Sequence, residues 1–281
     1  MVVLVLGGFG QVGQAIEHIS DAYPDIIFTF KSSKDADVTE PDSLQEAFIA
    51  VKPDFCINAA AYTAVDKAES EAKSAVAINT LGVSNVAEVC KKFDVVLLHI
   101  STDYVFDGTK DSPYHEDDET NPQTIYGKTK LEGEIAIENQ WNKHFIIRTS
   151  WLYSQFGSNF MLTMIKLADR QQAINVVNDQ TGTPTHALEL ARMLIAVVRS
   201  RSTNYGIYHF SNEGSATWFE FASEIFKLNN KSVQINPVET EFFQSAAARP
   251  RYSVLDKSKI KSEFNLEIRN WNEALNHYRY S

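Results

Sequence analysis

The stretch VVLVLGGFGQVGQAI, residues 2–16, decides the fold class of this chain. Its first five residues are all aliphatic, which is typical of a strand that is buried on both faces. Glycines 7, 10 and 13 follow directly, and helical spacing of apolar residues begins there. Gly7 permits a tight turn, Gly10 lets the backbone approach an anion, and Gly13 lets the helix pack closely on the strand. The pattern predicts a dinucleotide pyrophosphate at the helix N-terminus; the alternative is a tight turn without a ligand.

Strand-like runs and segments with helical spacing alternate through the first half of the chain. β-Branched and aromatic runs at 25–30, 54–58, 95–101 and 144–150 read as strands, and segments at 41–51, 71–92 and 126–140 have helical spacing. Strands that are apolar throughout occur where helices cover both faces of a parallel sheet. The sequence therefore predicts an α/β, doubly wound, Rossmann-type parallel sheet.

The pattern becomes less regular after Trp151. Helical segments at 158–170, 187–199, 217–229 and 270–278 mix with strand-like runs at 173–177 and 206–211, and no Pro/Gly linker separates them. We expect residues 1–150 to form a dinucleotide-binding domain to which the chain returns within 171–211. Residues 151–281 should form mainly a smaller C-terminal α/β lobe for the substrate.

Composition and charge exclude several classes of protein. The 281 residues are 44% hydrophobic and 22% charged, which is ordinary for a globular protein, and the formal charge is -10. An acidic surface repels nucleic acid and anionic lipid, and no apolar run reaches the roughly 18 residues of a membrane span. Cys56 and Cys90 lack CxxC spacing, and no signal peptide is evident, so we expect a reducing, cytoplasmic location.

Tyr126 and Lys130 form a Y-x-x-x-K pattern in a helical segment, which places both side chains on one face. A lysine ammonium beside a phenol should lower the pKa of the tyrosine and make it a usable proton donor. Taken alone, the pair is more typical of a solvated helix face. The segment STDYVFDG at 101–108 changes this, because it follows a strand and brings Thr102 to the edge of the sheet where the cofactor crevice lies.

The end of the second strand bears on the cofactor. NAD-preferring sites usually carry an acid there, whereas this chain has TFKSSK at 29–34. Lys31 and Ser32 suit a 2′-phosphate, so we expect NADPH, with NADH and a solvated loop tip as the alternatives. Asp37 lies too far along the chain to replace the ribose acid and should lie beside the adenine.

Several longer segments carry a resemblance to a known family. They are NAAAYTAVDKAE (58–69), STDYVFDG (101–108), YGKTKLEGE (126–134), RTSWLY (148–153), SNFMLTMIKLA (158–168), NDQTGTPT (178–185) and ARPRYSVLD (248–256). In this order they resemble the extended short-chain dehydrogenase/reductases, and among these the dTDP-4-dehydrorhamnose reductases. The resemblance covers nearly the whole chain.

The resemblance implies reduction of the C4 ketone of a dTDP-4-keto-6-deoxy-L-sugar, giving dTDP-L-rhamnose for cell-surface polysaccharide. It implies that Tyr126 donates the proton, that Lys130 holds the nicotinamide ribose, and that Thr102 polarises the ketone. Cofactor contacts would come from Gly7, Gly10, Gln11, Val12, Gly13, Lys31, Ser32, Asp37, Val38, Ala59, Ala60, Ala61 and Tyr62, together with Tyr126 and Lys130. Substrate contacts would come from Thr102, Asp103, Tyr104, Tyr126, Trp151, Asn159 and Arg249, and for Arg249 a surface ion pair is the alternative.

One departure from the family concerns metal. Some members form a dimer bridged by Mg²⁺, held partly by carboxylates at positions that are Ala15 and Leu188 here, with Glu189 adjacent. A hard cation needs oxygen ligands, so we expect no metal site. A homodimer remains open, but not one bridged by a metal.

Three other functions share parts of this pattern. A 4,6-dehydratase usually carries an Asp-Glu pair after the threonine, whereas this chain has Asp103 and Tyr104. A C4 epimerase shares the tyrosine and lysine but keeps its cofactor oxidised. A non-catalytic regulatory subunit with this fold would tolerate loss of the catalytic residues, none of which is lost here.

Overall fold

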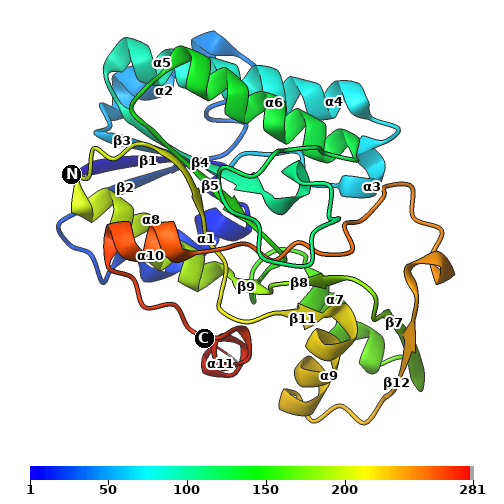
Figure 1. The fold of residues 1–281 in the computed structure, drawn as a ribbon. Coiled ribbons are helices and arrows are strands. Elements are labelled where there is room, and N and C mark those ends of the chain that lie inside the picture. Colours follow the sequence, from blue (N-terminus) through cyan, green and yellow to red (C-terminus); the bar gives the residue numbers. More distant parts are fainter. Residues whose placement is uncertain (279–281) are drawn as a thin grey trace.

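A six-stranded parallel sheet forms the centre of the computed structural model, which describes residues 1–278 (Figure 1). Its strands lie in the order β10-β5-β4-β3-β1-β2. Their bounds are β1 Val2–Leu6, β2 Ile27–Lys31, β3 Phe55–Asn58, β4 Val96–Thr102, β5 His144–Thr149 and β10 Gly206–His209. The order reverses beside β1, as the doubly wound prediction requires, so the predicted fold class is confirmed.

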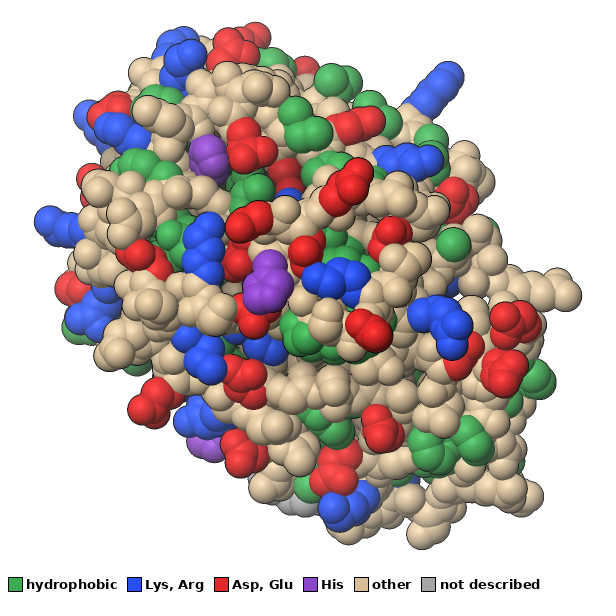
Figure 2. All heavy atoms as spheres, in the orientation of Figure 1, with side chains coloured by type: hydrophobic (Ala, Val, Ile, Leu, Met, Phe, Trp, Pro, Cys, Tyr) green, Lys and Arg blue, Asp and Glu red, His purple; other side chains and the backbone are tan. Residues whose placement is uncertain are grey.

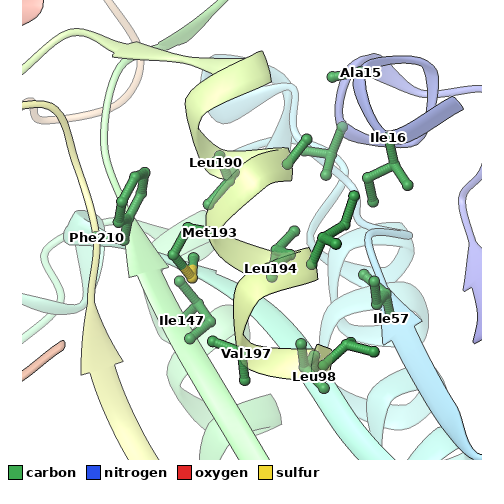
Figure 3. Close-up of a cluster of buried hydrophobic side chains, with 14 of the residues drawn as sticks. Ala15, Ile16, Ile57, Leu98, Ile147, Leu190, Met193, Leu194, Val197 and Phe210 are labelled. Atoms are coloured by element: carbon green, nitrogen blue, oxygen red, sulfur yellow. The ribbon is translucent and has the colours of Figure 1, made fainter. Parts of the chain in front are cut away.

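Helices cover both faces of the sheet. On one face lie α1 Gln11–Ser20, α8 Ala187–Ser200 and α10 Ser258–Phe264, and on the other α2 Pro41–Val51, α5 Val83–Phe93 and α6 Ile125–Gln140. Figure 3 shows α8 laying Leu190, Met193, Leu194 and Val197 against Ile57, Leu98 and Ile147 of the sheet. Although α8 and β10 come late in the sequence, they pack on α1 and pair with β5, respectively.

Successive residues of each strand point to opposite faces of the sheet, which separates apolar side chains from polar ones. Leu98 and Ile147 face α8, whereas the next residue along each strand, His99 and Arg148, faces α6. The α6 face is therefore apolar at the amino ends of the strands and becomes polar toward their carboxyl ends. That polar end is where the candidate site lies.

The helical segment predicted at 71–92 is confirmed, and it contains a π-turn that the sequence pattern did not predict. The structure has α4 Ala72–Val76, a π-helical turn η1 Ala77–Gly82, and then α5. Within the π-turn, Asn79 accepts a hydrogen bond from Tyr62 N at 2.9 Å and donates one to Tyr62 O at 3.1 Å. These bonds tie the helix to the loop after β3. Two further short helices, α3 Val65–Ala68 and η2 Asp103–Val105, lie near this loop and after β4.

A second, smaller cluster of elements lies beyond the carboxyl ends of the strands. Its core packs α7 Phe160–Ala168 and α9 Trp218–Leu228 against β7 Ala173–Val177, which pairs in parallel with β12 Gln234–Val238. Thr217 and Glu220 form a capping box that starts α9. The remaining elements are β6 Leu152–Tyr153, β8 Thr181–Gly182, β9 Thr185–His186, β11 Ala216–Thr217, η3 Thr240–Phe242 and α11 Trp271–His277.

The surface in Figure 2 carries acidic and basic side chains interspersed, and neither sign forms a continuous area on that face. Within residues 1–278, no helix has both the length and the apolar character that crossing a membrane requires.

Candidate active site

Two adjoining cavities open at the carboxyl ends of the parallel strands. The first has a volume of about 600 Å³ and the second about 750 Å³, and Thr63, Val65, Tyr104 and Leu152 line both. Of the residues predicted from sequence, the first cavity is lined by Gly10, Gln11, Val12, Ala59, Ala61, Thr102, Asp103, Tyr104, Tyr126, Lys130 and Trp151. Folding thus brings segments from five parts of the chain to one space.

The glycine turn has the geometry that a dinucleotide needs. Gly7 has φ +71°, and a Cβ there would lie 2.7 Å from Ala60 N, so only glycine fits. A Cβ on Gly13 would lie 2.1 Å from Gly8 O, which explains the close packing of helix on turn. Gly10 is the N-cap of α1 and supplies no side-chain cap, so first-turn N–H groups remain available to an anion.

The predicted adenosine contacts lie outside the lining of both cavities. The Ser32 hydroxyl donates to Asp35 at 2.6 Å, and this bond together with Lys31 and Lys34 lowers the pKa of Asp35. Asp37 accepts hydrogen bonds from the amide and hydroxyl of Thr39 and so holds its own turn. A Cβ on Gly82 would lie 2.8 Å from Val38, which places Val38 against the π-turn.

The loop after β3 is held by side chains on either side of it. Asn58 accepts from Ala60 N at 3.1 Å, and the hydroxyl of Tyr62 donates to Glu71 at 2.6 Å. Ala59 and Ala61 line the first cavity, whereas Ala60 and Tyr62 do not. Small alanine side chains leave this wall open to a planar ligand.

Thr102, Asp103 and Tyr126 meet in the interior of the first cavity. Thr102 Oγ1 donates to Asp103 at 3.1 Å and accepts from Tyr104 N at 3.2 Å. Burial raises the pKa of Asp103 to about 6. The rings of Tyr104 and Tyr126 pack edge to face with centroids 5.5 Å apart. Two hydroxyl groups and a buried carboxyl thus face one space beside the glycine turn.

The expected lowering of the Tyr126 pKa is wrong in this structure. Burial raises the pKa of Tyr126 to about 12, against a hydrogen bond with Thr102 that lowers it. Lys130 does not offset this rise, because its Nζ donates to Ile100 O at 2.6 Å and lies 3.2 Å from His99 Nε2. Burial also lowers the pKa of Lys130, to about 8, although Glu134 raises it.

Trp151 lines the first cavity. It has φ +46°, a left-handed conformation that large side chains rarely adopt, and its indole stacks on Trp218 with centroids 3.5 Å apart. Gly182 makes room for the ring, because a Cβ there would lie 2.5 Å from it. Packing of the indole against Trp218 and Gly182 holds this conformation.

Arg249 and Asn159 have partners within the protein. Arg249 lines the second cavity and forms an ion pair with Asp66 at 2.5 Å, so the ion pair and the cavity position coexist. Asn159 lines neither cavity. Its amide nitrogen donates to Gln11, Ser154 and Phe156, and its oxygen caps α7 through Leu162 N.

Several residues in and around the site carry no local sequence signal. Trp218 of α9, Phe160 and Met164 of α7, and Gln180 of the loop after β7 line the second cavity. Beneath the first cavity, Glu134 pairs with Arg148 through three hydrogen bonds of 2.7–3.2 Å. Glu134 lies four residues after Lys130 on α6, so helical spacing from the Y-x-x-x-K pattern is the signal that could have found it.

The residues at the positions considered for a metal make packing contacts and hydrogen bonds within the protein. Ala15 and Leu188 are buried between α1 and α8, and Glu189 bonds Arg269 and the Tyr278 hydroxyl. In the part of the chain that the structure describes, no three His, Cys, Asp or Glu side chains gather as a metal site would require.

The residues fit a dinucleotide on two observations. The glycine turn forms a cradle that a Cβ would fill, and Thr149 Oγ1, in the wall of the first cavity, is buried with no hydrogen-bond partner among the described residues. A hydroxyl without a partner is costly unless a ligand satisfies it.

Comparisons with known proteins show which family this chain resembles. A family model described as RmlD substrate binding domain matches residues 1–280. A dTDP-4-dehydrorhamnose reductase from Aggregatibacter actinomycetemcomitans is 36% identical, over 99% of this chain and 98% of that protein. A crystal structure of a dTDP-4-dehydrorhamnose reductase from Clostridium acetobutylicum ATCC 824 superimposes with a TM-score of 0.94 at 39% identity, covering 99% and 98% of the two chains. That of the Bacillus anthracis str. Ames reductase in complex with NADP gives 0.94 at 38% identity, with the same coverage.

Proposed function

Because this chain belongs to the RmlD substrate-binding family, we propose that it is an NADPH-dependent dTDP-4-dehydrorhamnose reductase. It reduces the C4 ketone of dTDP-4-dehydrorhamnose and yields dTDP-L-rhamnose. The observation that carries the proposal is the meeting of Gly10, Thr102, Tyr126 and Lys130 around one cavity. The relatives and the crystal structure with NADP support the reaction and the cofactor. We also propose a cytoplasmic location, with which the free, buried Cys56 and Cys90 are consistent.

In this proposal, the glycine turn and the loop after β3 hold the dinucleotide. Gly10, Gln11 and Val12 present the start of α1 to the pyrophosphate, and Ala59 and Ala61 form the wall beside it. Lys31 and Ser32 hold the 2′-phosphate. Bound NADPH supplies the hydride; the proton must come from the protein.

Tyr126 is the proton donor in the proposed mechanism. A pKa raised to about 12 keeps the phenol protonated at neutral pH, which is the state an acid needs. Thr102 releases its bond to Asp103 and donates to the ketone oxygen, which stabilises the negative charge that develops there. Lys130 leaves Ile100 and holds the nicotinamide ribose, so that its ammonium lowers the cost of forming a phenolate on Tyr126.

The second cavity takes the nucleotide part of the substrate in this proposal. Arg249 offers a forked donor for the diphosphate, and Asp103, Tyr104 and Trp151 line the adjoining first cavity, where the sugar would lie. The stacked Trp218 and Trp151 provide a flat apolar wall.

The test is a cofactor-oxidation assay with dTDP-4-dehydrorhamnose, in which we expect one NADPH consumed per sugar reduced. An epimerase would turn over without net NADPH loss, and a regulatory subunit would show no turnover with any sugar nucleotide. Tyr126→Phe should lower kcat by roughly 10²- to 10⁴-fold. Tyr208→Phe is the matched control, because that tyrosine is also buried but donates to Asn204 O at the far edge of the sheet. Wild-type turnover by Tyr126→Phe would refute the assignment of the acid.

A further inference from the structure

His99 lies behind Lys130 and is sealed from solvent. It sits on β4 opposite Asn58 of β3 in the parallel register, and both side chains are at most 1% exposed. Asn58 Nδ2 is 3.2 Å from His99 Nδ1, and Lys130 Nζ is 3.2 Å from His99 Nε2. The imidazole therefore bridges the neighbouring strand and the lysine of the Y-x-x-x-K pattern.

The partners of Asn58 decide which nitrogen of His99 carries the proton. Asn58 Oδ1 accepts from Ala60 N at 3.1 Å, so the other end of the amide, the NH₂ group, faces His99. An NH₂ group only donates, and His99 Nδ1 must accept with its lone pair. Burial lowers the pKa of His99 well below its usual range, so the ring is neutral and its one proton lies on Nε2.

This tautomer constrains Lys130. Nε2–H points at Lys130 Nζ, and an ammonium has no lone pair with which to accept from it. A neutral amine can accept from His99 and still donate to Ile100 O at 2.6 Å. The hydrogen-bond pattern as a whole is therefore satisfied by neutral Lys130 and unsatisfied by its ammonium.

We propose that His99 is a positioning residue that favours the neutral amine of Lys130 in the free protein, so that dinucleotide binding at alkaline pH is coupled to uptake of a proton by Lys130. On binding, Lys130 exchanges His99 for the ribose and becomes the ammonium that supports Tyr126. This inference rests on the proposed function only for its second half, because the tautomer belongs to the free protein.

The other charged groups around Lys130 do not reverse this preference. Glu134, on the same helix, favours the ammonium, but it is engaged by Arg148 of β5 through a fork of hydrogen bonds and by Ser101 of β4. Asp103, which follows β4, has a pKa raised to about 6 and bonds Thr102. Tyr126 is a neutral phenol at pH 8. Burial lowers the pKa of Lys130 to about 8, in the same direction as His99.

The tautomer is tested by NMR of the free protein labelled with ¹⁵N-histidine. His99→Phe identifies the His99 signals among those of the seven histidines. We expect a protonated Nε2 and an unprotonated Nδ1 for His99 at pH 9. The reverse tautomer, or an imidazolium, would overturn the proposal whatever the protein catalyses.

Proton uptake is tested by calorimetry of NADP⁺ binding in buffers of different ionisation enthalpy. With a pKa of about 8 in the free protein, Lys130 should take up ~0.9 proton at pH 9 and ~0.1 at pH 7. His99→Gln offers an amide oxygen that accepts from an ammonium, so uptake at pH 9 should fall to less than half. His144→Gln is the matched control, because His144 is also buried but lies at the amino end of β5.

The outcomes separate this inference from the proposed function. Binding with equal proton uptake in wild type and His99→Gln would refute the role of His99 and leave the reductase assignment in place. Absence of NADP⁺ binding would refute the proposed function, and the NMR spectrum would still decide the tautomer. If His99→Gln fails to fold, the wild-type spectrum and the wild-type pH dependence of uptake remain decisive.

Discussion

Arg148 Nη2 lies 2.7 Å from Glu134 Oε2, and neither side chain is more than 3% exposed. The pair joins β5 to α6 directly beneath Thr102 and Lys130, and Arg148 also lies over the ring of Phe106. Such a buried pair adds little net stability, but it is costly to break because one charge is then left alone in the interior. It therefore fixes the position of the helix that carries both Tyr126 and Lys130.

We expect Glu134→Gln to lower the free energy of unfolding by about 3–5 kcal/mol, because Arg148 loses its counter-charge. The double variant Glu134→Leu with Arg148→Met should recover most of this loss. Urea unfolding of the two variants and the wild type gives both values. An unchanged unfolding midpoint for Glu134→Gln would contradict the prediction.

Gly13→Ala and Gly10→Ala should separate folding from dinucleotide binding. A Cβ on Gly13 meets the backbone of Gly8 at 2.1 Å, so this variant should lose about 3 kcal/mol of stability or more. A Cβ on Gly10 meets only Gly7 O, at 3.2 Å, and the φ of –75° suits alanine. Gly10→Ala should fold normally yet bind NADP⁺ at least ~10-fold more weakly. Thermal unfolding measures the stability of each variant, and calorimetry measures its binding of NADP⁺. Equal losses of stability in Gly13→Ala and Gly10→Ala would contradict the prediction.

Asp103→Asn should stabilise the protein at high pH. Burial raises the pKa of Asp103 from 3.8 to about 6. When the pKa of an acid rises on folding, its ionised form destabilises the folded state. This cost is present in full above pH 6 and is absent below pH 3.8. The free energy of unfolding of the variant should exceed that of the wild type by on the order of 3 kcal/mol at pH 8, and this difference should shrink toward pH 4.

Asp107→Asn is the control for this pH dependence. Hydrogen bonds from Thr109 and Tyr114 lower the pKa of Asp107, so its substitution should lower stability at neutral pH. Unfolding free energies at several pH values decide the matter. A gain from Asp103→Asn that did not vary with pH would exclude burial of the carboxylate as its cause.

Trp218→Ala should impair substrate binding without impairing cofactor binding. The Trp218 ring lines the second cavity and stacks on Trp151 at 3.5 Å. Loss of this stacked wall should raise the KM for the sugar nucleotide roughly 10-fold, while the Kd for NADP⁺ stays near the wild-type value. Trp141→Phe, far from both cavities at the end of α6, is the control. A larger effect on NADP⁺ than on substrate would place Trp218 at the wrong subsite.

Lys31→Ala should weaken the preference for NADPH. Lys31 ends β2, and its charge lies near Asp35 in the loop where we place the 2′-phosphate. Removing one charge-assisted hydrogen bond should raise the KM for NADPH about 10-fold and leave that for NADH nearly unchanged. Steady-state kinetics with both cofactors measure the ratio, and a parallel rise in both values would argue against this assignment.

Much of the site could be read from short segments of the sequence. The glycine turn, Thr102 after its strand, and the Tyr126–Lys130 pair each depend on neighbours within about one helical turn. Their convergence follows from the rule that the carboxyl ends of parallel strands meet at one edge. The first cavity brings them together at that edge.

The π-turn at 77–82 is a feature that sequence reading did not predict. The apolar spacing of 71–92 correctly indicates a helical segment, but the bonds that accompany the π-turn involve the backbone of Tyr62, 17 residues before Asn79. The predicted lowering of the Tyr126 pKa was wrong because contacts with distant residues also decide where Lys130 points. Helical spacing places Lys130 beside Tyr126, but Ile100 and His99, 30 and 31 residues earlier, draw the amine away.

The order of residues alone determined the fold class and the phosphate turn and led to the proposed reacting side chains, because each depends on local spacing and on strand-by-strand apolar character. Only the tertiary structure decided which groups are buried and which partners they find there. The tautomer of His99, the raised pKa of Asp103 and the stacking of Trp151 on Trp218 all arise between residues distant in the chain. Desolvation and long-range contacts set these properties, and neither can be predicted from a short stretch of sequence.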